Sequence, residues 1–296
     1  MPLEQAILPA TSAIFFGTQY VPQKKLGEVN TAHYNLSMAI GLVITSTIIF
    51  SILFLIGMPL LHWIPIVIAF LSGIVWSIGN RLSIVGVNRI GMSKAAILFN
   101  LNSVFSFIFG VLFYAESIGL FKLIGMPIIV CGSVIVAAIT GEEKKEVNWF
   151  GISAAIVAAF VFSIFNTLAN ESVSSHINPT LPYYVMALFM SIGALVGNLF
   201  FINTPRKFRE WRSEKPKFHY CAFSGGSLLA SGFFISLYSL AAYGLSFTIP
   251  ILQTVLLLVS AIWGLLYFKE IRKGKSLLLF LIGAGISILG IIIFSW

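Results

Sequence analysis

Amide and indole side chains inside apolar stretches are the groups of this chain that could bind a ligand. Trp76 and Asn80 lie four residues apart, and Ser83 follows three residues later, so a helix would bring all three to one face. An indole ring can stack on the C–H face of a sugar while an amide bonds its hydroxyl groups. The segment therefore predicts a surface that binds a small polar solute. The alternative is that Asn80 bonds a neighbouring helix.

A second group of amides lies between residues 100 and 106. On a helix, Asn100 and Ser103 would share one face, and Asn102 and Ser106 would share another. One face should line a cavity and the other should pack. We expect Asn100 to face the cavity, because adding the internal repeat distance described below leads to Thr254, beside another amide.

That other amide is Gln253, which follows Pro250 by three residues. Proline removes a backbone donor, so the helix would have a carbonyl in need of another partner. A kinked helix that carries a glutamine at cavity depth predicts a binding element, with plain packing as the alternative.

Four further polar residues have two interpretations each. Gln19 and Asn166 are lone amides in apolar runs, so either could line the pathway or bond another helix. Tyr238 could belong to the site or to the core. Arg81 could extend to the membrane interface or pair with an anionic substrate.

Known catalytic patterns do not occur in the sequence. There is no Asp, all ten acidic residues are Glu, and none lies in the middle of an apolar run. HExxH, G-x-S-x-G and phosphate-binding glycine loops do not occur, and Cys131 and Cys221 have no metal-ligand spacing. We therefore expect no enzyme activity, no cofactor and no metal.

The composition predicts an all-α membrane protein. The chain of 296 residues is 58% hydrophobic and 9% charged, with a mean hydropathy of +0.97, which a water-soluble domain could not bury. The net charge of +8 comes from basic residues between apolar runs. This pattern is typical of membrane-flanking charge and predicts the lipid bilayer as partner, with no binding of nucleic acid.

Ten apolar stretches are long enough to cross a bilayer, which needs about 20 residues each. They are Leu3–Val21, Leu36–Gly57, Ile64–Val87, Ala95–Tyr114, Ile118–Ile139, Trp149–Leu168, Tyr183–Phe201, Ala222–Tyr243, Leu245–Tyr267 and Ser276–Phe294.

The basic residues predict how these spans are oriented. Of the 18 Lys and Arg residues, all but Lys122 fall on one side of the ten spans. The positive-inside rule makes that side cytoplasmic, so both termini should lie outside the cell membrane.

Two helix ends read almost alike, FGVLFYAE (Phe109–Glu116) and WGLLYFKE (Trp263–Glu270), 154 positions apart (270 − 116). The polar stretch GEEKKEVN (Gly141–Asn148) lies between them. With five spans in each half, the second half enters the membrane from the other side. We therefore predict two inverted five-helix repeats, residues 1–146 and 147–296.

Glycines spaced by seven residues occur in the last span of each predicted half. Gly125 and Gly132 form one pair, and Gly283 and Gly290 form the other. Seven residues is two helical turns, so each pair makes a smooth stripe for close helix approach. The stripes predict packing, either between the two halves or between the protomers of a homodimer.

The arrangement resembles the drug/metabolite transporter superfamily, and within it the glucose/ribose porter branch. FFGTQYVPQKK (Phe15–Lys25) is similar to the opening of that branch, and GIVWSIGNRLSIVGVNRIGMSKA (Gly73–Ala95) is similar to its third span. Arg81 departs from the pattern, since a neutral residue is expected there in a porter of simple sugars.

The resemblance implies a secondary transporter that moves a small polar solute, with a sugar as the leading candidate and uptake as the direction. An anionic sugar derivative, such as a sugar phosphate or nucleotide sugar, and an exported metabolite are the alternatives within the superfamily. A membrane sensor or scaffold that binds solute without moving it is the alternative of another class.

Overall fold

The computed structural model of the protein describes residues 4–55, 62–91, 95, 98–115, 119–137, 148–174, 182–268 and 274–294. Every regular element in these ranges is helical. In chain order the elements are α1 (Glu4–Thr18), α2 (Tyr20–Lys24), α3 (Thr31–Phe54), α4 (Trp63–Ile90), α6 (Leu101–Tyr114), α7 (Leu120–Ala137), α8 (Trp149–Val173), α9 (Tyr183–Leu199), α10 (Pro205–Arg212), α11 (Pro216–Tyr243), α12 (Leu245–Ile262), the π-helix η1 (Trp263–Tyr267) and α13 (Lys275–Phe294).

Six of these helices are long and apolar enough to cross a membrane, namely Thr31–Phe54, Trp63–Ile90, Trp149–Val173, Pro216–Tyr243, Leu245–Ile262 and, within α13, Leu277–Phe294. Helices α6 and α9 and the stretch Leu120–Gly132 of α7 are shorter and also apolar. The prediction of an all-α membrane protein is therefore confirmed. The number of ten spans and the inverted repeat stay predictions, and the boundary between residues 146 and 147 lies outside the described residues.

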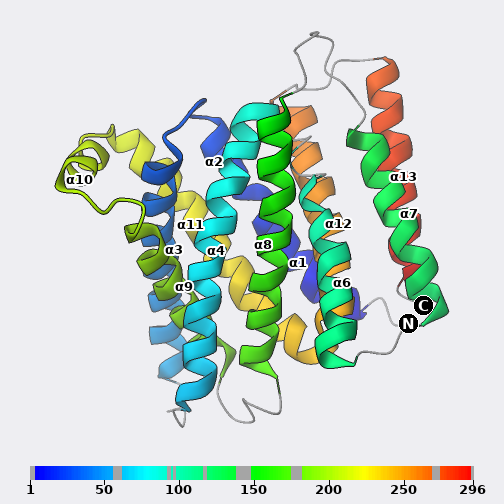
Figure 1. Ribbon diagram of the computed structural model, residues 1–296, viewed down its shortest axis with the longest axis horizontal. Coiled ribbons are helices and arrows are strands. Elements are labelled where there is room, and N and C mark those ends of the chain that lie inside the picture. The colour runs from blue at the N-terminus through cyan, green and yellow to red at the C-terminus, as the bar shows by residue number, and fades with distance from the viewer. Residues whose placement is uncertain are drawn as a thin grey trace.

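The helices run side by side in a bundle (Figure 1). Helix α4 packs against α8 and α9, while α3 packs against α11 and α9. Helix α1 packs against α11 and α12, and α6 packs against α8 and α12. These contacts bring the first helices of the chain against its second half.

Two of the bundle's interfaces depend on glycine. A methyl group added at Gly73 of α4 would lie 1.9 Å from the carbonyl oxygen of Met190 in α9. One added at Gly226 of α11 would lie 2.0 Å from the carbonyl oxygen of Met38 in α3. Both distances are far below van der Waals contact, so the α4–α9 and α3–α11 pairs approach as closely as backbones allow.

Helices α7 and α13 form a pair at one side of the bundle (Figure 1). A methyl group at Gly132 would lie 2.6 Å from the carbonyl oxygen of Gly283, and one at Gly290 would lie 3.1 Å from that of Gly125. The prediction that the glycine stripes serve close helix packing is confirmed, and the partners are the two stripes themselves.

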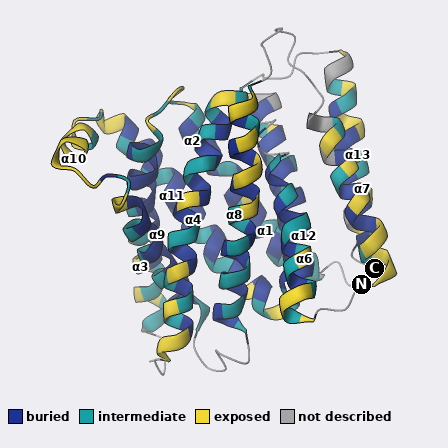
Figure 2. Cartoon of the chain, in the orientation of Figure 1, coloured by how far each residue is buried: buried dark blue, intermediate teal, exposed yellow. Residues whose placement is uncertain are grey.

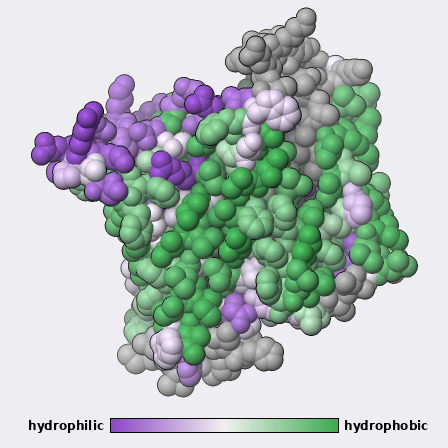
Figure 3. Space-filling model, viewed as in Figure 1, coloured by the Kyte–Doolittle hydropathy of each residue, from purple (hydrophilic) through white to green (hydrophobic). Residues whose placement is uncertain are grey.

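The outer surface of the bundle is apolar, as lipid contact requires. Exposed side chains along the helices are largely apolar, whereas buried residues face inward (Figure 2). Hydrophilic side chains gather around α10 on the face shown in Figure 3. Basic residues Lys24, Lys25 and Arg89 lie at helix ends on the same side of the bundle as α10, a side called the basic face from here on.

Helix α10 lies in a stretch that the sequence predicts only as a basic loop. Thr204 caps it, because its hydroxyl oxygen accepts a hydrogen bond from the backbone N–H of Lys207 at 3.3 Å. Pro205 occupies the first helical position, where its missing N–H is not needed. A capping residue followed by proline marks the start of a helix. The spans are predicted from the length of apolar runs, and that criterion does not detect such a start.

Candidate functional site

A cavity lies in the middle of the bundle, among helices of both halves. It offers about 50 Å³ to the centres of water molecules, and one water needs roughly 10–15 Å³ on this measure. It therefore holds a few waters. Its wall consists of Phe16, Gln19, Tyr20, Trp76, Phe99, Asn102, Phe162, Phe165, Asn166, Ala169, Leu229, Phe233, Ser236, Leu240, Ile249, Leu252, Gln253 and Leu256.

Aromatic rings make up much of the wall. Phe233 of α11 lies at the centre of a cluster, with its ring centroid 5.6 Å from that of Phe16, 5.7 Å from Trp76 and 5.3 Å from Phe165. The rings of Phe16 and Trp76 stand edge-on to Phe233, an arrangement that aromatic pairs favour. Trp76 is 3% exposed, so its position is fixed by packing on several helices.

Amide side chains supply the polar part of the wall. The side-chain nitrogen of Asn166 in α8 donates to the side-chain oxygen of Asn102 in α6 at 3.1 Å. Ser106 also donates to that oxygen, at 3.0 Å. Gln253 of α12 lies in the wall at 8% exposure. The wall thus presents amides from α6, α8 and α12, and those of α6 and α8 already bond each other.

Gln19 differs from the other amides. It stands between α1 and α2, where the first helix is interrupted by one residue. Its side-chain oxygen is buried and has no hydrogen-bond partner. A buried acceptor without a partner costs about 1–3 kcal/mol, so this oxygen is suited to receive a hydrogen bond from a molecule in the cavity.

None of the described residues that line the cavity carries a charge. Groups of three or more His, Cys, Asp or Glu residues able to hold a metal are likewise not found in the described ranges. The wall can therefore stack on apolar groups and exchange hydrogen bonds. Acid, base or metal chemistry would require groups that this wall does not supply.

Comparison with known proteins relates the first part of the chain to a transporter family. Residues 5–138 match the EamA-like transporter family. It is a family of transporters and not of enzymes, which confirms the prediction that the chain is not an enzyme. Over these residues the chain is similar to membrane transporters, in agreement with its resemblance to the drug/metabolite transporter superfamily.

The fold also has a counterpart among solved structures. One, titled "Crystal structure of protein", is similar with a TM-score of 0.70 and 13% sequence identity, over 99% of this chain and 96% of that chain. At this identity the likeness concerns the fold alone. No curated protein matches the chain.

Four of the eight predicted site residues line the cavity, namely Gln19, Trp76, Asn166 and Gln253. Asn102 lines it too, whereas Asn100 does not. Asn100 stands in the turn just before α6, where its side-chain oxygen accepts a hydrogen bond from Ser103 at 3.3 Å. The structure thus turns the Asn102 face of α6 toward α8, opposite to our expectation.

Asn80 lies between helices and not in the cavity wall. Its side chain donates to the side-chain oxygen of Asn35 in α3, and Asn35 in turn donates to the backbone carbonyl of Ser77 at 3.1 Å. This is the interhelical bond that the sequence offers as the alternative interpretation of Asn80.

Arg81 and Tyr238 also lie outside the cavity wall. The guanidinium of Arg81 lies 4.3 Å from the ring centre of Phe201, just beyond the end of α9. This position favours the interface interpretation of Arg81. Tyr238 is 39% exposed and contacts the ring of Tyr183 at 4.6 Å.

The acidic ends of the two similar segments, Glu116 and Glu270, lie outside the described residues, as does Lys94. Tyr20, Asn102 and Ser236 are polar wall residues that the sequence does not single out, although Asn102 has a signal in the sequence. That signal is the pair Asn102 and Ser106, which lie four residues apart and share one face of the helix. Their spacing does not tell whether this face points to the cavity.

Proposed function

We propose that this protein is a carrier that moves an uncharged, polar organic solute across the cell membrane by alternating access, with a sugar as the leading substrate. The observation that carries the proposal is the central cavity. It joins aromatic faces, which stack on C–H groups, to amides, which bond hydroxyls. The free oxygen of Gln19 supplies an acceptor inside it.

The lack of charge in the described wall bears on the choice between a neutral sugar and an anionic sugar derivative. A phosphate or carboxylate in this cavity would lose its hydration without meeting a cation, which is costly in a buried site. Arg81, the residue that could have paired with an anion, stacks on Phe201 away from the wall. The geometry therefore favours a neutral solute over an anionic sugar derivative.

The size of the cavity supports a mechanism with closed and open states. The space for a few waters is smaller than a monosaccharide, so the cavity must widen before it can hold one. A solute can then enter only after helices move apart on one face, as a carrier requires.

Helix packing supports the inverted repeat. The close, glycine-mediated α3–α11 contact has a counterpart in the α4–α9 contact. Likewise, α1 contacts α12 as α8 contacts α6. Two inverted five-helix repeats would make α1 equivalent to α8, α3 to α9, α4 to α11 and α6 to α12. Under this equivalence the α3–α11 contact becomes the α9–α4 contact, and the α1–α12 contact becomes the α8–α6 contact.

The proposed orientation has the basic face in the cytoplasm and both termini outside. Helix α1 begins, and α13 ends, on the side away from the basic face (Figure 1). A reporter fused after residue 296 should give a non-cytoplasmic signal, and a cytoplasmic signal would overturn this orientation.

The test is counterflow with purified protein in liposomes, using neutral sugars, sugar phosphates and amino acids as competitors. Gln19→Leu removes the free acceptor of the cavity and should lower counterflow by about tenfold, which corresponds to one hydrogen bond of about 1.4 kcal/mol. Gln23→Leu is the matched control, since Gln23 is buried outside the cavity wall, where it bonds Asn88.

Each outcome has a defined meaning. Counterflow of a neutral sugar that Gln19→Leu weakens and Gln23→Leu retains supports the proposal. Flux of anionic solutes alone, lost in Arg81→Gln, would establish the anionic alternative. Binding without any flux would mean that the protein is a sensor.

A further inference from the structure

The segment that contains α10 is the most basic part of the described chain. Residues 205–217 contain six basic side chains and two acidic ones, a net charge of +4 (6 − 2). The basic residues are Arg206, Lys207, Arg209, Arg212, Lys215 and Lys217, and all of them are exposed. The proposed transport through the central cavity uses none of them.

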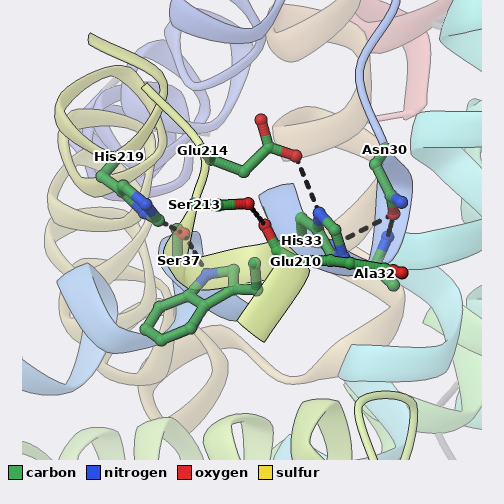
Figure 4. A network of polar contacts seen from close by, with 9 residues as sticks. Asn30, Ala32, His33, Ser37, Glu210, Ser213, Glu214 and His219 are labelled. Atoms are coloured by element: carbon green, nitrogen blue, oxygen red, sulfur yellow. Dashed lines mark hydrogen bonds and ion pairs between the residues drawn. The ribbon is translucent and has the colours of Figure 1, made fainter. Parts of the chain in front are cut away.

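This segment is fixed to the bundle by a network of polar contacts (Figure 4). The indole N–H of Trp211 donates to the hydroxyl of Ser37 in α3 at 2.8 Å. The ring nitrogen Nδ1 of His219 lies 2.9 Å from the same hydroxyl. The carboxylate of Glu214 lies 2.8 Å from Nδ1 of His33. These contacts hold α10 in one orientation against α3 and the start of α11.

The orientation separates the aromatic and basic sides of α10. Phe208 and Trp211 lie three residues apart with ring centroids at 5.1 Å, and Trp211 faces the bundle through Ser37. Phe208 remains 44% exposed. Arg209 and Arg212 point outward with the other basic side chains. The helix is therefore amphipathic, with one aromatic ring left uncovered beside a basic surface.

The position of α10 places that surface beside lipid. Helix α10 projects sideways from the bundle near the ends of α3 and α9 (Figure 1). Figure 3 shows the hydrophilic patch directly beside the apolar side of the bundle. Phospholipid headgroups lie at this boundary between the apolar belt and water.

We propose that α10 and residues 213–217 bind the headgroups of anionic phospholipids. Basic side chains attract phosphate, and a short amphipathic helix with an exposed aromatic ring is suited to the membrane surface. The segment keeps a net charge of +4 with both acids counted; Glu210 accepts a hydrogen bond from Arg206 at 2.9 Å, and the carboxylate of Glu214 lies 2.8 Å from Nδ1 of His33. The expected partner is a phosphatidylglycerol-like lipid of the leaflet on the basic face.

Native mass spectrometry of the full chain in detergent tests the proposal without any transport substrate, so its outcome is independent of the proposed function. Wild-type protein is titrated with phosphatidylglycerol or phosphatidylcholine, and bound lipid is counted. The variant Arg206→Gln/Arg209→Gln/Arg212→Gln should bind phosphatidylglycerol about 100-fold more weakly, since each basic group near a membrane contributes about 1 kcal/mol. Phosphatidylcholine binding should not change.

The matched control is Lys94→Gln/Lys144→Gln/Lys145→Gln, which removes three charges predicted on the same side of the membrane and should retain the phosphatidylglycerol preference. An equal preference in wild type and the α10 variant, or a larger loss in the control, would overturn the proposal. Competition by free glycerol phosphate at equal concentration would also overturn it, because the surface would then bind phosphate rather than lipid. If the triple variant does not fold, Arg209→Gln alone should still weaken binding by about fivefold.

Discussion

The two helix ends of similar sequence contact the rest of the molecule by different chemistry. At the end of α6, the hydroxyl of Tyr114 donates to the backbone carbonyl of Thr167 in α8 at 2.9 Å. Phe109, one turn earlier, packs its ring against Phe160 of the same helix at 6.1 Å. This contact is neutral, and α6 ends beyond it with Ala115 in the left-handed conformation at φ 48°.

The corresponding end of α12 contacts α1 and α2 on the basic face. The indole N–H of Trp263 donates to the hydroxyl of Thr18 at 3.2 Å. Tyr267 and Phe268 lie under the ammonium groups of Lys25 and Lys24, each at 5.1 Å from the ring centre. Here α12 continues as the π-helix η1, which turns these rings toward the lysines.

The comparison shows that a repeated sequence can keep a role and change its chemistry. Each helix end holds the first helix of the other half, so both are placed to close one face of the proposed carrier. The α6 end, called the neutral clasp, consists of Phe109 and Tyr114. The α12 end, called the basic clasp, consists of Trp263, Tyr267 and Phe268. The basic clasp contacts two titratable groups, Lys24 and Lys25.

The largest effect is expected from opening the basic clasp with Trp263→Ala. The change removes a hydrogen bond and a partly buried ring, together about 2 kcal/mol, which shifts the closed–open balance roughly 30-fold. The measurement is alkylation of Ser236→Cys, a cavity residue, by a membrane-impermeant maleimide in a Cys131→Ser/Cys221→Ser background.

Labelling should rise when the maleimide is added on the basic face, and it should not change when the maleimide is added on the opposite face. Trp149→Ala is the control, since this tryptophan is 72% exposed and should have no effect. An equal rise from both faces would mean that the variant disturbs the fold and not one clasp.

A smaller effect, on labelling from the opposite face of the membrane, is expected from Tyr114→Phe in the neutral clasp. It removes one hydrogen bond of about 1 kcal/mol, so labelling of Ser236→Cys should rise roughly fivefold from the face opposite the basic one. The matched control is Tyr220→Phe, because Tyr220 is 75% exposed. A rise from the basic face would contradict the assignment of this clasp.

A third effect concerns pH and is measured on stability. Burial beside Phe268 lowers the pKa of Lys24 from 10.5 to about 8. The unfolded chain therefore binds more protons between pH 8 and pH 10.5, and stability should rise with pH through that window and stay constant below it. Lys24→Gln should remove this rise in the midpoint of thermal unfolding, whereas Lys25→Gln, which leaves Lys24 in place, should retain it. A rise of equal size in Lys24→Gln would assign it to another group.

The spans could be predicted from sequence because lipid imposes a length. The apolar run Tyr183–Phe201 corresponds to α9, and Ile64–Val87 corresponds to α4, within a few residues. Helix α10 could not be found this way, since its stability comes from a cap and from contacts with α3, and neither requires an apolar run. The interruption at Gln19 could not be predicted either, because the length of an apolar run does not show where the helix inside it is interrupted.

The site was predictable in composition and less so in position. Intramembrane amides point to functional regions because they are costly in lipid, and Gln19, Asn166 and Gln253 do line the cavity. The same cost is offset when an amide bonds another helix, as Asn80 does with Asn35. Spacing along one helix gives a face but not its direction, so the choice between Asn100 and Asn102 depends on where α8 lies.

The uncharged wall of the cavity also has an electrical consequence. An inorganic ion entering it would exchange its water shell for rings and a few amides, and such a transfer costs several kcal/mol for each ion. The described wall offers no countercharge to offset that loss. The resting protein should therefore insulate the membrane, so a cell could hold many copies of it without a leak of its ion gradients.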